Sequence, residues 1–367
     1  MHLPMIDTLL FFIDIENYDD IIDTLTTKLD KKKEEAKEAI RNNSSKIVSI
    51  EIGSMTYEVL PNGKKGYAYI LHNDLYEVDI AEYRSRNKDF YPIFIKIKSE
   101  CLWSYGPYQA WTNVCQWVLD NIGNITDEKI SRIDLCCHTD EFCIASDDLV
   151  ENFKGQFYTQ TAYWYRRKVN AMTFGSSASN KIFARIYDKV LEINQRKSKK
   201  WFYEIWKNAG MNCGKVWNIE FQINREFMKD RNINSVNDAF NNIGSIWEYC
   251  TIQWLLKINL DNERSTRCSI NEKWLQIQKC FKEYDSKPLI KREKQLNMDA
   301  EAMVPATYGN ITTFAAKLGM KDPAMVLKQL HNRGEEYLKS KKLNFKKIVS
   351  KKEALLDQER RMQPIKV

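Results

Sequence analysis

Apolar and polar residues alternate, or a single polar residue interrupts an apolar run, in three segments near the middle of the chain. These segments are residues 131–138, 182–187 and 216–223. Such short patterns predict β-strands. In the second segment every other residue is apolar, and the opposite face carries Arg185 and Tyr187. The pattern therefore predicts one strand that presents an arginine and a tyrosine together.

One carboxylate interrupts each of the other two strands, Asp134 in the first and Glu220 in the third. Acidic residues are disfavoured in strands and are rarely buried unless they are paired or bind a metal. We therefore predict a sheet on which Asp134, Glu220 and Tyr187 converge. Carboxylates that hold a divalent cation beside a tyrosine hydroxyl suit phosphoryl transfer to a protein nucleophile. The alternative is that Tyr187 is a half-buried packing residue.

The rest of the chain mixes helical and strand patterns without a regular βαβ repeat, which favours an α+β fold. Three-to-four spacing of apolar residues predicts helices at 17–41 and 109–122, and alternation predicts a strand-rich region at 46–97. Residues 1–15 are predicted to form an opening strand, the first in this sequence. The expected core is a twisted, mostly antiparallel sheet with helices packed on it.

Two helices around a glycine-containing turn are predicted near the C-terminal end. The first stops at Gly319, and Asp322 caps the second, with Pro323 at its first position. This pattern is typical of a helix-turn-helix, in which Lys328 and Arg333 would face a DNA major groove. An ordinary helical hairpin is the alternative.

Composition and charge divide the chain into three parts. We expect a sheet-based domain at 1–287, a polar linker at 288–298, and a basic helical DNA-binding module with a tail at 299–367. From Ser286 onward, 18 Lys and Arg residues stand against 9 Asp and Glu residues. This segment therefore carries all of the excess positive charge, which points to a polyanionic partner such as DNA. A solubilising tail is the alternative.

The overall composition is that of a globular protein, with 43% hydrophobic and 12% aromatic residues among 367. No apolar run approaches the roughly 18 residues that span a bilayer, so no membrane partner is expected. The nine cysteines contain no C-x-x-C pair. Reduced thiols are the simplest interpretation, and we expect a cytoplasmic protein.

Two further stretches predict contacts with DNA. Aromatic and basic residues are interleaved at 163–168, where Arg166, Arg167 and Lys168 would contact phosphates and the rings would stack on bases. A hydroxyl-rich loop precedes the tyrosine strand. We expect Ser176, Ser177 and Lys181, in and after this loop, to contact DNA as well.

The order of these motifs resembles the replication initiation factor family. This family comprises rolling-circle plasmid initiators of the Rep_trans type and related relaxases of integrative conjugative elements. The resemblance covers roughly residues 96–229. It rests on Arg-x-Asp-Leu at 132–135, Phe-Gly-Ser-x-x-Ser-x-Lys-x-x-x-Arg-Ile-Tyr-Asp-Lys at 174–189, and Trp-x-x-Glu-Phe-Gln at 217–222.

The resemblance implies that Tyr187 nicks one strand of origin DNA, forms a 5′-phosphotyrosyl intermediate and later rejoins the strand. It implies a divalent metal, Mg²⁺ or Mn²⁺, held by Asp134 and Glu220. Arg185 and Lys189 would then flank the scissile phosphate and stabilise its charge. A homodimer is also implied, and we expect a host helicase as a further partner.

The third metal ligand departs from the family pattern. Relatives often carry a second acidic residue four positions after the first, and that position is His138 here, with Asp140 two residues further on. Either residue would complete the metal shell. Two other functions remain open: a DNA-binding regulator without activity, and a metal-dependent hydrolase that uses Asp134, Glu220 and His138 on water, with no covalent intermediate.

Overall fold

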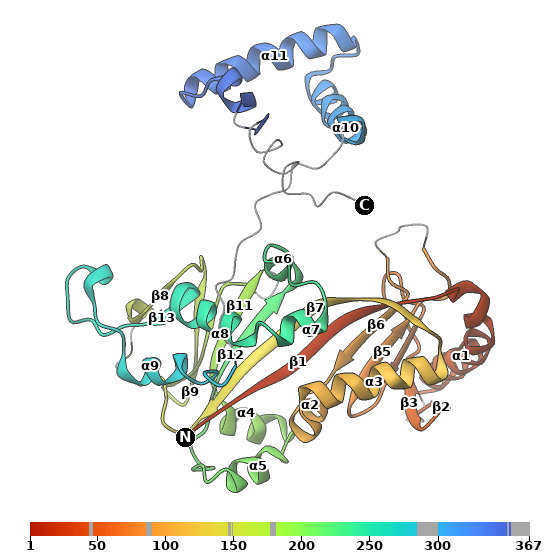
Figure 1. Cartoon of the computed structure of the whole chain (residues 1–367), viewed down its shortest axis with the longest axis vertical. Helices are drawn as coiled ribbons and strands as arrows, with labels where there is room; N and C mark the ends of the chain where they lie inside the picture. Colours follow the sequence, from red (N-terminus) through yellow and green to blue (C-terminus); the bar gives the residue numbers. More distant parts are fainter. Residues whose placement is uncertain are drawn as a thin grey trace, which may run out of the picture. The chain divides into compact units, whose positions relative to one another are not determined.

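The structure is a computed structural model of the chain, and it divides into two compact units, Met1–Lys291 and Arg292–Val367 (Figure 1). The linker predicted at 288–298 lies outside the described residues. The described residues, apart from the side chains of 300, 302 and 306, are 1–43, 47–85, 90–145, 148, 150–176, 181–284, 300–350 and 352–353.

The first unit is an α+β fold built on one large sheet. In the part of the chain that the structure describes, this sheet has eleven strands in the order β2-β3-β4-β5-β6-β1-β7-β12-β11-β10-β9, and every pairing is antiparallel. The strands are β1 (His2–Ile15), β2 (Ser49–Ile52), β3 (Met55–Val59), β4 (Tyr69–His72), β5 (Tyr76–Ile80), β6 (Ile93–Ile97), β7 (Ile125–Thr139), β9 (Gln160–Tyr165), β10 (Lys168–Phe174), β11 (Ile182–Asp188) and β12 (Trp217–Asn224).

The two longest strands, β1 and β7, lie side by side at the centre of the sheet (Figure 1). Their pairing runs from His2 opposite Thr139 to Ile15 opposite Ile125. The opening strand expected from the sequence is therefore confirmed, and it occupies the middle of the sheet. β12 pairs with the other side of β7 and β11 pairs with β12.

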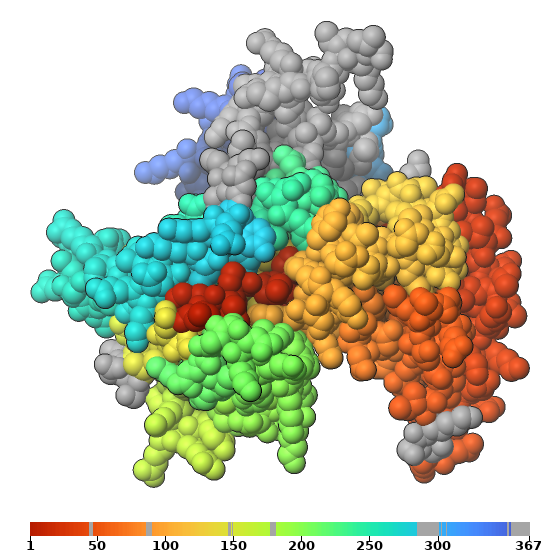
Figure 2. All heavy atoms as spheres, turned by 60° about the horizontal axis from the view of Figure 1, so that its bottom comes forward, coloured from red at the N-terminus to blue at the C-terminus, as the bar shows by residue number. Residues whose placement is uncertain are grey.

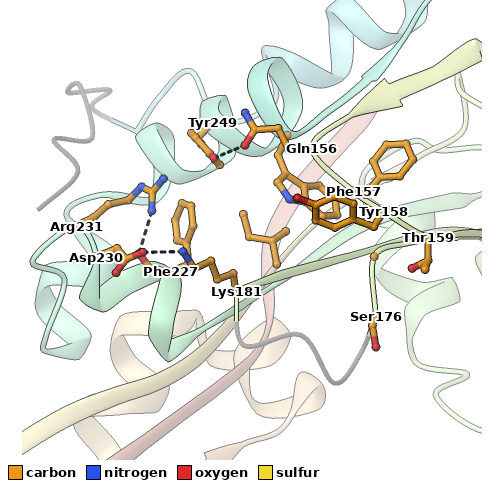
Figure 3. Close-up of a pocket in the computed structure, with 13 residues that line it drawn as sticks. Gln156, Phe157, Tyr158, Thr159, Ser176, Lys181, Phe227, Asp230, Arg231 and Tyr249 are labelled. Carbon is orange, nitrogen blue, oxygen red and sulfur yellow. Dashed lines mark hydrogen bonds and ion pairs between the residues drawn. The ribbon is translucent and has the colours of Figure 1, made fainter. Parts of the chain in front are cut away.

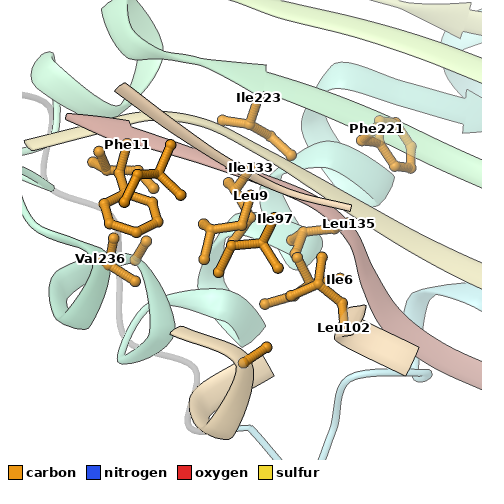
Figure 4. Packing of buried hydrophobic residues seen from close by; sticks show 14 of the residues in the cluster. Ile6, Leu9, Phe11, Ile97, Leu102, Ile133, Leu135, Phe221, Ile223 and Val236 are labelled. Atoms are coloured by element: carbon orange, nitrogen blue, oxygen red, sulfur yellow. The ribbon is translucent and has the colours of Figure 1, made fainter. Parts of the chain in front are cut away.

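One face of the sheet is covered by helices. Alternate residues of β1, β7 and β12, among them Leu9, Phe11, Leu135 and Phe221, point to this face and are fully buried (Figure 4). Helices on this side place apolar residues such as Val236 in the same core. They are α1 (Tyr18–Arg41), α2 (Ser99–Tyr105), α3 (Pro107–Asn121), α7 (Val236–Phe240), α8 (Ile243–Glu248) and α9 (Glu272–Gln278).

Smaller elements complete the first unit. They are a short helix α6 (Arg225–Lys229), a π-helix at Tyr249–Trp254, two 3₁₀ turns at Val150–Asn152 and Ser265–Arg267, and a two-stranded sheet of β8 (Phe153–Gly155) and β13 (Leu255–Lys257). The helix predicted at 17–41 matches α1, because Tyr18, Ile22 and Leu29 recur at helical spacing and are buried.

The opposite face of the sheet is only partly covered. Helices α4 (Lys189–Arg196) and α5 (Phe202–Asn208) pack here through a second apolar cluster that contains Phe202 and Trp206 and that Leu3 of β1 contacts. Figure 2 shows the beginning of the chain, in dark red, beside the green residues of this region. The polar side chains of β7, β11 and β12 point to the same side as α4 and α5, and they form the site described below.

The second unit contains the two predicted C-terminal helices, α10 (Ala300–Leu318) and α11 (Pro323–Ser340). Gly319 follows α10 with a φ of +66°, a left-handed conformation that favours glycine. Asp322 caps α11 by accepting hydrogen bonds from the backbone N–H groups of Ala324 (2.8 Å) and Met325 (3.1 Å). The predicted turn and cap are confirmed. No helix among the described residues is long and apolar enough to cross a membrane.

Candidate active site

Three adjacent strands bring the predicted residues to one face of the sheet. In the register, Tyr187 on β11 lies opposite Asn218 on β12, and Arg185 lies opposite Glu220. Directly opposed residues in an antiparallel pair share a face. The residues between them, such as Ile186, belong to the helix-covered core. Tyr187, Arg185 and Glu220 therefore point to the face that carries α4 and α5.

The hydroxyl group of Tyr187 makes three hydrogen bonds. It donates to Oε2 of Glu220 (3.0 Å), and it accepts from Nδ2 of Asn218 (3.0 Å) and from Nζ of Lys189 (3.2 Å). Asn218 also donates to the same Glu220 oxygen (3.2 Å), and Arg185 forms an ion pair with the other one. The phenol oxygen thus has a carboxylate that can accept its proton and a cation that can stabilise its negative charge.

Burial holds this phenol in its protonated form. The pKa of Tyr187 lies well above its usual value, first because the ring is removed from water and then because Glu220 is negatively charged. Lys189 is fully buried and pairs with Glu192 at 2.8 Å. Tyr187 therefore needs a proton acceptor to become a nucleophile, and Glu220 already accepts its hydrogen bond.

Asp134 lies on the same face of the neighbouring strand β7. It is 1% exposed, and Nε of Arg132 donates to its Oδ1 at 2.7 Å. Burial raises the pKa of Asp134 to about 6; Arg132 opposes this shift and the charge of Glu220 adds to it. In the register Asp134 lies opposite Gln222, which makes Glu220 its diagonal neighbour. Two buried carboxylates on adjacent strands thus repel each other.

The carboxylates of Asp134 and Glu220 are the type of ligand that a divalent cation prefers. Mg²⁺ and Mn²⁺ prefer carboxylate oxygens, and a cation would offset both the burial of the Asp134 charge and its repulsion from Glu220, which together raise the pKa of Asp134. A third ligand is not close by. Among the described residues, the only three His, Cys, Asp or Glu side chains whose ligand atoms lie within 4.8 Å of one another are His2, Cys137 and Cys280, a different group.

His138 lies on the same face as Asp134, in an aromatic environment. Its ring stacks on Trp103 with the centroids 4.7 Å apart, and its Nδ1 accepts a hydrogen bond from Nε1 of Trp206 (3.1 Å). Burial lowers the pKa of His138 well below its usual value, so the ring is neutral. Asp140 instead accepts hydrogen bonds from the N-terminal amine (2.6 Å) and from the backbone N–H of Asn212 (2.8 Å). The identity of a third ligand stays a prediction.

The interleaved aromatic and basic residues form the hairpin of β9 and β10. Arg166 and Arg167 are its two-residue turn, with φ values of 47° and 64°. Such a turn favours Asn-Gly, because a side chain in the left-handed region is strained. Tyr163 is 49% exposed and lies opposite Ala171, which lies opposite Tyr187. An exposed ring therefore lies two strands from the phenol, on the same face.

We expect that replacing these arginines so as to relieve the strain in this turn will raise the stability of the protein while weakening its binding to DNA. Replacing Arg166 by Asn together with Arg167 by Gly should raise the free energy of unfolding by about 1–2 kcal/mol, because it relieves two unfavourable φ values. The same change should weaken binding to single-stranded DNA. Loss of two phosphate contacts would make the slope of log K against log salt shallower by roughly 1.4.

A matched control is the replacement of both arginines by Gln, which removes the charges but keeps the strain. It should lose DNA affinity without gaining stability. Fluorescence anisotropy across a salt series and denaturant unfolding give the two measurements. An unchanged salt slope in both variants would contradict the predicted contact.

Ser176 and Lys181 line a pocket that is separate from the tyrosine cluster. The pocket has a volume of about 450 Å³, and none of its lining residues belongs to that cluster (Figure 3). Aromatic rings, including Phe157 and Trp254, make up much of the lining, and Lys181 forms an ion pair with Asp230 at 2.9 Å. Ser177 lies outside the described residues. The predicted DNA contacts before and after this loop therefore do not adjoin Tyr187.

Three remaining residues of the predicted DNA-binding set are exposed. Lys168 begins β10, directly after the strained turn. Lys328 and Arg333 lie on α11, and the Arg333 guanidinium is 5.7 Å from the centre of the Phe314 ring of α10. All three side chains are therefore accessible to a phosphate.

Sequence reasoning missed two residues that contact the predicted ones. Asn218 bonds both Tyr187 and Glu220, and Arg132 holds Asp134. Each lies two positions before a carboxylate on the same strand, and residues two apart share a face of a strand. The two-residue spacing from each carboxylate could therefore have identified Asn218 and Arg132 from the sequence.

Comparisons with known proteins are sparse. No family model matches the sequence, and no curated protein matches it. Among solved structures, the chain is similar to a rolling circle replication initiator protein from Geobacillus stearothermophilus. The TM-score is 0.45 and the sequence identity 13%, and the match covers 80% of this chain and 100% of that chain. A likeness of this size leaves the function to be argued from the residues of this chain.

Proposed function

We propose that the protein is a metal-dependent enzyme that nicks and rejoins one strand of DNA through Tyr187, as an initiator of rolling-circle replication or of conjugative transfer. The observation that carries this proposal is the hydrogen-bonded group around the phenol. Tyr187 donates to a buried carboxylate and accepts from a buried lysine. A tyrosine that only packs can be satisfied by one partner, as Tyr18 is by the backbone oxygen of Ala81, and does not need both a carboxylate and a cation.

The proposed reaction is a transesterification. Oε2 of Glu220, 3.0 Å from the phenol oxygen, accepts the proton as that oxygen attacks the scissile phosphorus. A bond from phosphorus to the tyrosine oxygen forms, the bond to the 3′-oxygen breaks, and the 3′-oxygen leaves with a proton as a free hydroxyl. The product is a 5′-phosphotyrosyl link. Because the phosphodiester energy is kept, rejoining needs no ATP.

Positive groups around the phenol would stabilise the charge that develops. Lys189 lies 3.2 Å from the phenol oxygen, and Arg185 pairs with Glu220 in the free protein. Mg²⁺ or Mn²⁺, held by Asp134 and Glu220, would neutralise the phosphate and stabilise the departing oxygen. His138 is still the residue proposed to complete that shell, and because its ring nitrogens and the two carboxylates do not all lie within 4.8 Å of one another in this structure, these side chains would have to move to do so.

Replacing Lys189 by Met should lower the nicking rate by on the order of 10²-fold, because the phenolate loses its nearest cation. The pH at which nicking reaches half its maximum should also rise, since the pKa of Tyr187 increases when a neighbouring positive charge is removed. A pH–rate profile for single-turnover cleavage measures both effects. The matched control is Lys215→Met, an exposed lysine just before β12, which should leave the profile unchanged.

The proposed activity is tested with end-labelled single-stranded oligonucleotides and Mn²⁺, resolved on a denaturing gel. A labelled species that runs with the protein supports the proposal. Cleavage with no protein-linked product would instead indicate a hydrolase that activates water. Binding without cleavage, together with no nicking of a supercoiled plasmid, would indicate a DNA-binding regulator.

DNA and a second copy of the chain are the proposed partners. The exposed β9–β10 hairpin would hold single-stranded DNA, and Lys328 and Arg333 of α11 would contact duplex origin DNA. A homodimer is proposed because one nucleophile per subunit must serve both initiation and termination. A host helicase would then unwind the duplex from the nick.

A further inference from the structure

Three side chains that can bind a metal meet on the other face of β7. The ligand atoms of His2, Cys137 and Cys280 all lie within 4.8 Å of one another, and the two sulfur atoms are 3.1 Å apart. Cys137 points into the helix-covered core together with Leu135. The group is therefore separated by the sheet from Asp134 and Glu220.

Separate parts of the chain supply the three side chains. His2 begins β1, Cys137 lies near the end of β7, and Cys280 follows α9. Figure 2 shows the beginning of the chain, in dark red, beside the cyan segment that contains α9. Helix α9 is anchored by Trp274, which is fully buried and donates to the backbone oxygen of Thr251 at 3.0 Å. The position of Cys280 is thus set by well-packed neighbours.

The surroundings of the His2 ring indicate a bound metal ion. Both of its ring nitrogens are shielded from solvent, and neither has a hydrogen-bond partner among the described residues. Its Nε2 lies 3.1 Å from Oε2 of Glu141, which is within ion-pair distance but outside hydrogen-bond geometry. Buried polar atoms normally have partners. Nδ1 of His2 has neither a hydrogen-bond nor an ion-pair partner among the described residues, and the ring lies next to two thiols, which is the arrangement expected of a metal ligand.

We propose that His2, Cys137 and Cys280 bind a zinc ion that joins the start of β1 and the end of α9 to β7. Binding releases the two thiol protons to solvent, and no electron is transferred. Water or the Glu141 carboxylate takes the fourth position. This proposal does not depend on the nicking activity.

Distances favour zinc over a disulfide. Tetrahedral zinc with Zn–S bonds of ~2.3 Å places two sulfurs roughly 3.8 Å apart, so the observed 3.1 Å would open by about 0.7 Å. A disulfide would require closure by about 1 Å, to ~2.05 Å. It would also leave Nδ1 of His2 without a partner among the described residues. Two thiolates and an imidazole are a soft donor set, which zinc accepts and Mg²⁺ does not.

The test uses the full chain, expressed without an N-terminal extension and purified under a phosphine reductant. The protein is stripped with a chelator, reconstituted with Zn²⁺ alone and desalted, and the metal is counted per chain. Competition with a chromophoric chelator gives the affinity. Reconstitution with Co²⁺ reports thiolate ligation through its charge-transfer absorption.

Cys280→Ser and His2→Gln are the informative variants, because neither side chain is fully buried, whereas Cys137→Ser could prevent folding. The wild type should retain about one zinc per chain. Zinc affinity should fall on the order of 100-fold or more in Cys280→Ser, and at least about tenfold in His2→Gln. Cys268→Ser, a partly buried cysteine outside the group, should bind as the wild type does.

Three results would overturn the proposal. The reconstituted wild type could retain no zinc, or Cys280→Ser could bind zinc with wild-type affinity. The protein purified under the phosphine reductant could also have an intact mass two hydrogens lower than that of the all-thiol chain, with Cys137 and Cys280 found in one cross-linked peptide. Each of these results is independent of whether the protein nicks DNA.

Discussion

Replacing Tyr187 by Phe is expected to abolish the covalent protein–DNA adduct while leaving duplex binding unchanged. The proposed chemistry has one nucleophile, so the loss should be on the order of 10³-fold or more. The variant keeps the ring and removes only the hydroxyl. Burst-phase formation of the adduct on a labelled oligonucleotide measures the effect.

The fold should survive this change. Without the hydroxyl, Asn218 still donates to Glu220, and Lys189 still pairs with Glu192. We expect a change of about 1 kcal/mol in the free energy of unfolding, the usual size for one hydrogen bond. Tyr108→Phe, at an exposed tyrosine of α3, is the matched control and should form the adduct normally. An adduct that persists in Tyr187→Phe would show that another residue attacks the phosphate.

Replacing Asp134 by Asn should abolish metal-dependent nicking and yet stabilise the metal-free protein at pH 8. Burial raises the pKa of Asp134 from 3.8 to about 6, so the native state binds more protons than the unfolded state between these values. Stability is therefore lost as the pH rises through this window. The free energy of unfolding falls by about 3 kcal/mol at most as Asp134 ionises, and an uncharged Asn avoids this loss.

The difference in stability between Asp134→Asn and the wild type should depend on pH and on the presence of metal. It should be largest above pH ~6 and should vanish below pH ~4, where the carboxyl group is protonated in both states. Mn²⁺ should raise the melting temperature of the wild type at pH 8 and leave that of Asp134→Asn unchanged. Thermal unfolding across a pH series, with chelator or with Mn²⁺, gives these values.

Asp120→Asn, at an exposed residue of α3, is the control for the carboxyl-to-amide change. It should alter neither the pH dependence nor the effect of Mn²⁺. If Asp134→Asn proves less stable than the wild type at pH 8, the ion pair with Arg132 outweighs burial, and the metal-site argument from repulsion fails.

The sequence predicted the three strands of the site because a carboxylate inside an apolar run is unusual. It could not predict their order in the sheet. Along the chain the tyrosine strand lies between the two acidic ones, but in space the strand of Glu220 lies between β7 and β11. Strand order depends on which edges pair, and local periodicity carries no information about pairing.

Other features depended on contacts between distant residues. His2, Cys137 and Cys280 have no regular spacing, so only the fold brings them together. The strained Arg166–Arg167 turn broke the residue preference that identifies such turns from sequence. By contrast, the Asp322 cap was predictable because helix capping is a local interaction.

The central position of β1 affects how the chain is made. Strand β1 has its partners in β6 and β7, which both come later in the chain, and His2 pairs with Thr139, the last residue of β7. At a synthesis rate of about 5–20 residues per second, that partner appears roughly seven to twenty-seven seconds after His2. Until β7 emerges, one edge of this largely apolar fourteen-residue strand has no partner, and the other edge can pair only with β6. A nascent chain of this protein should therefore bind chaperones early and become protease-resistant only after β7 has emerged.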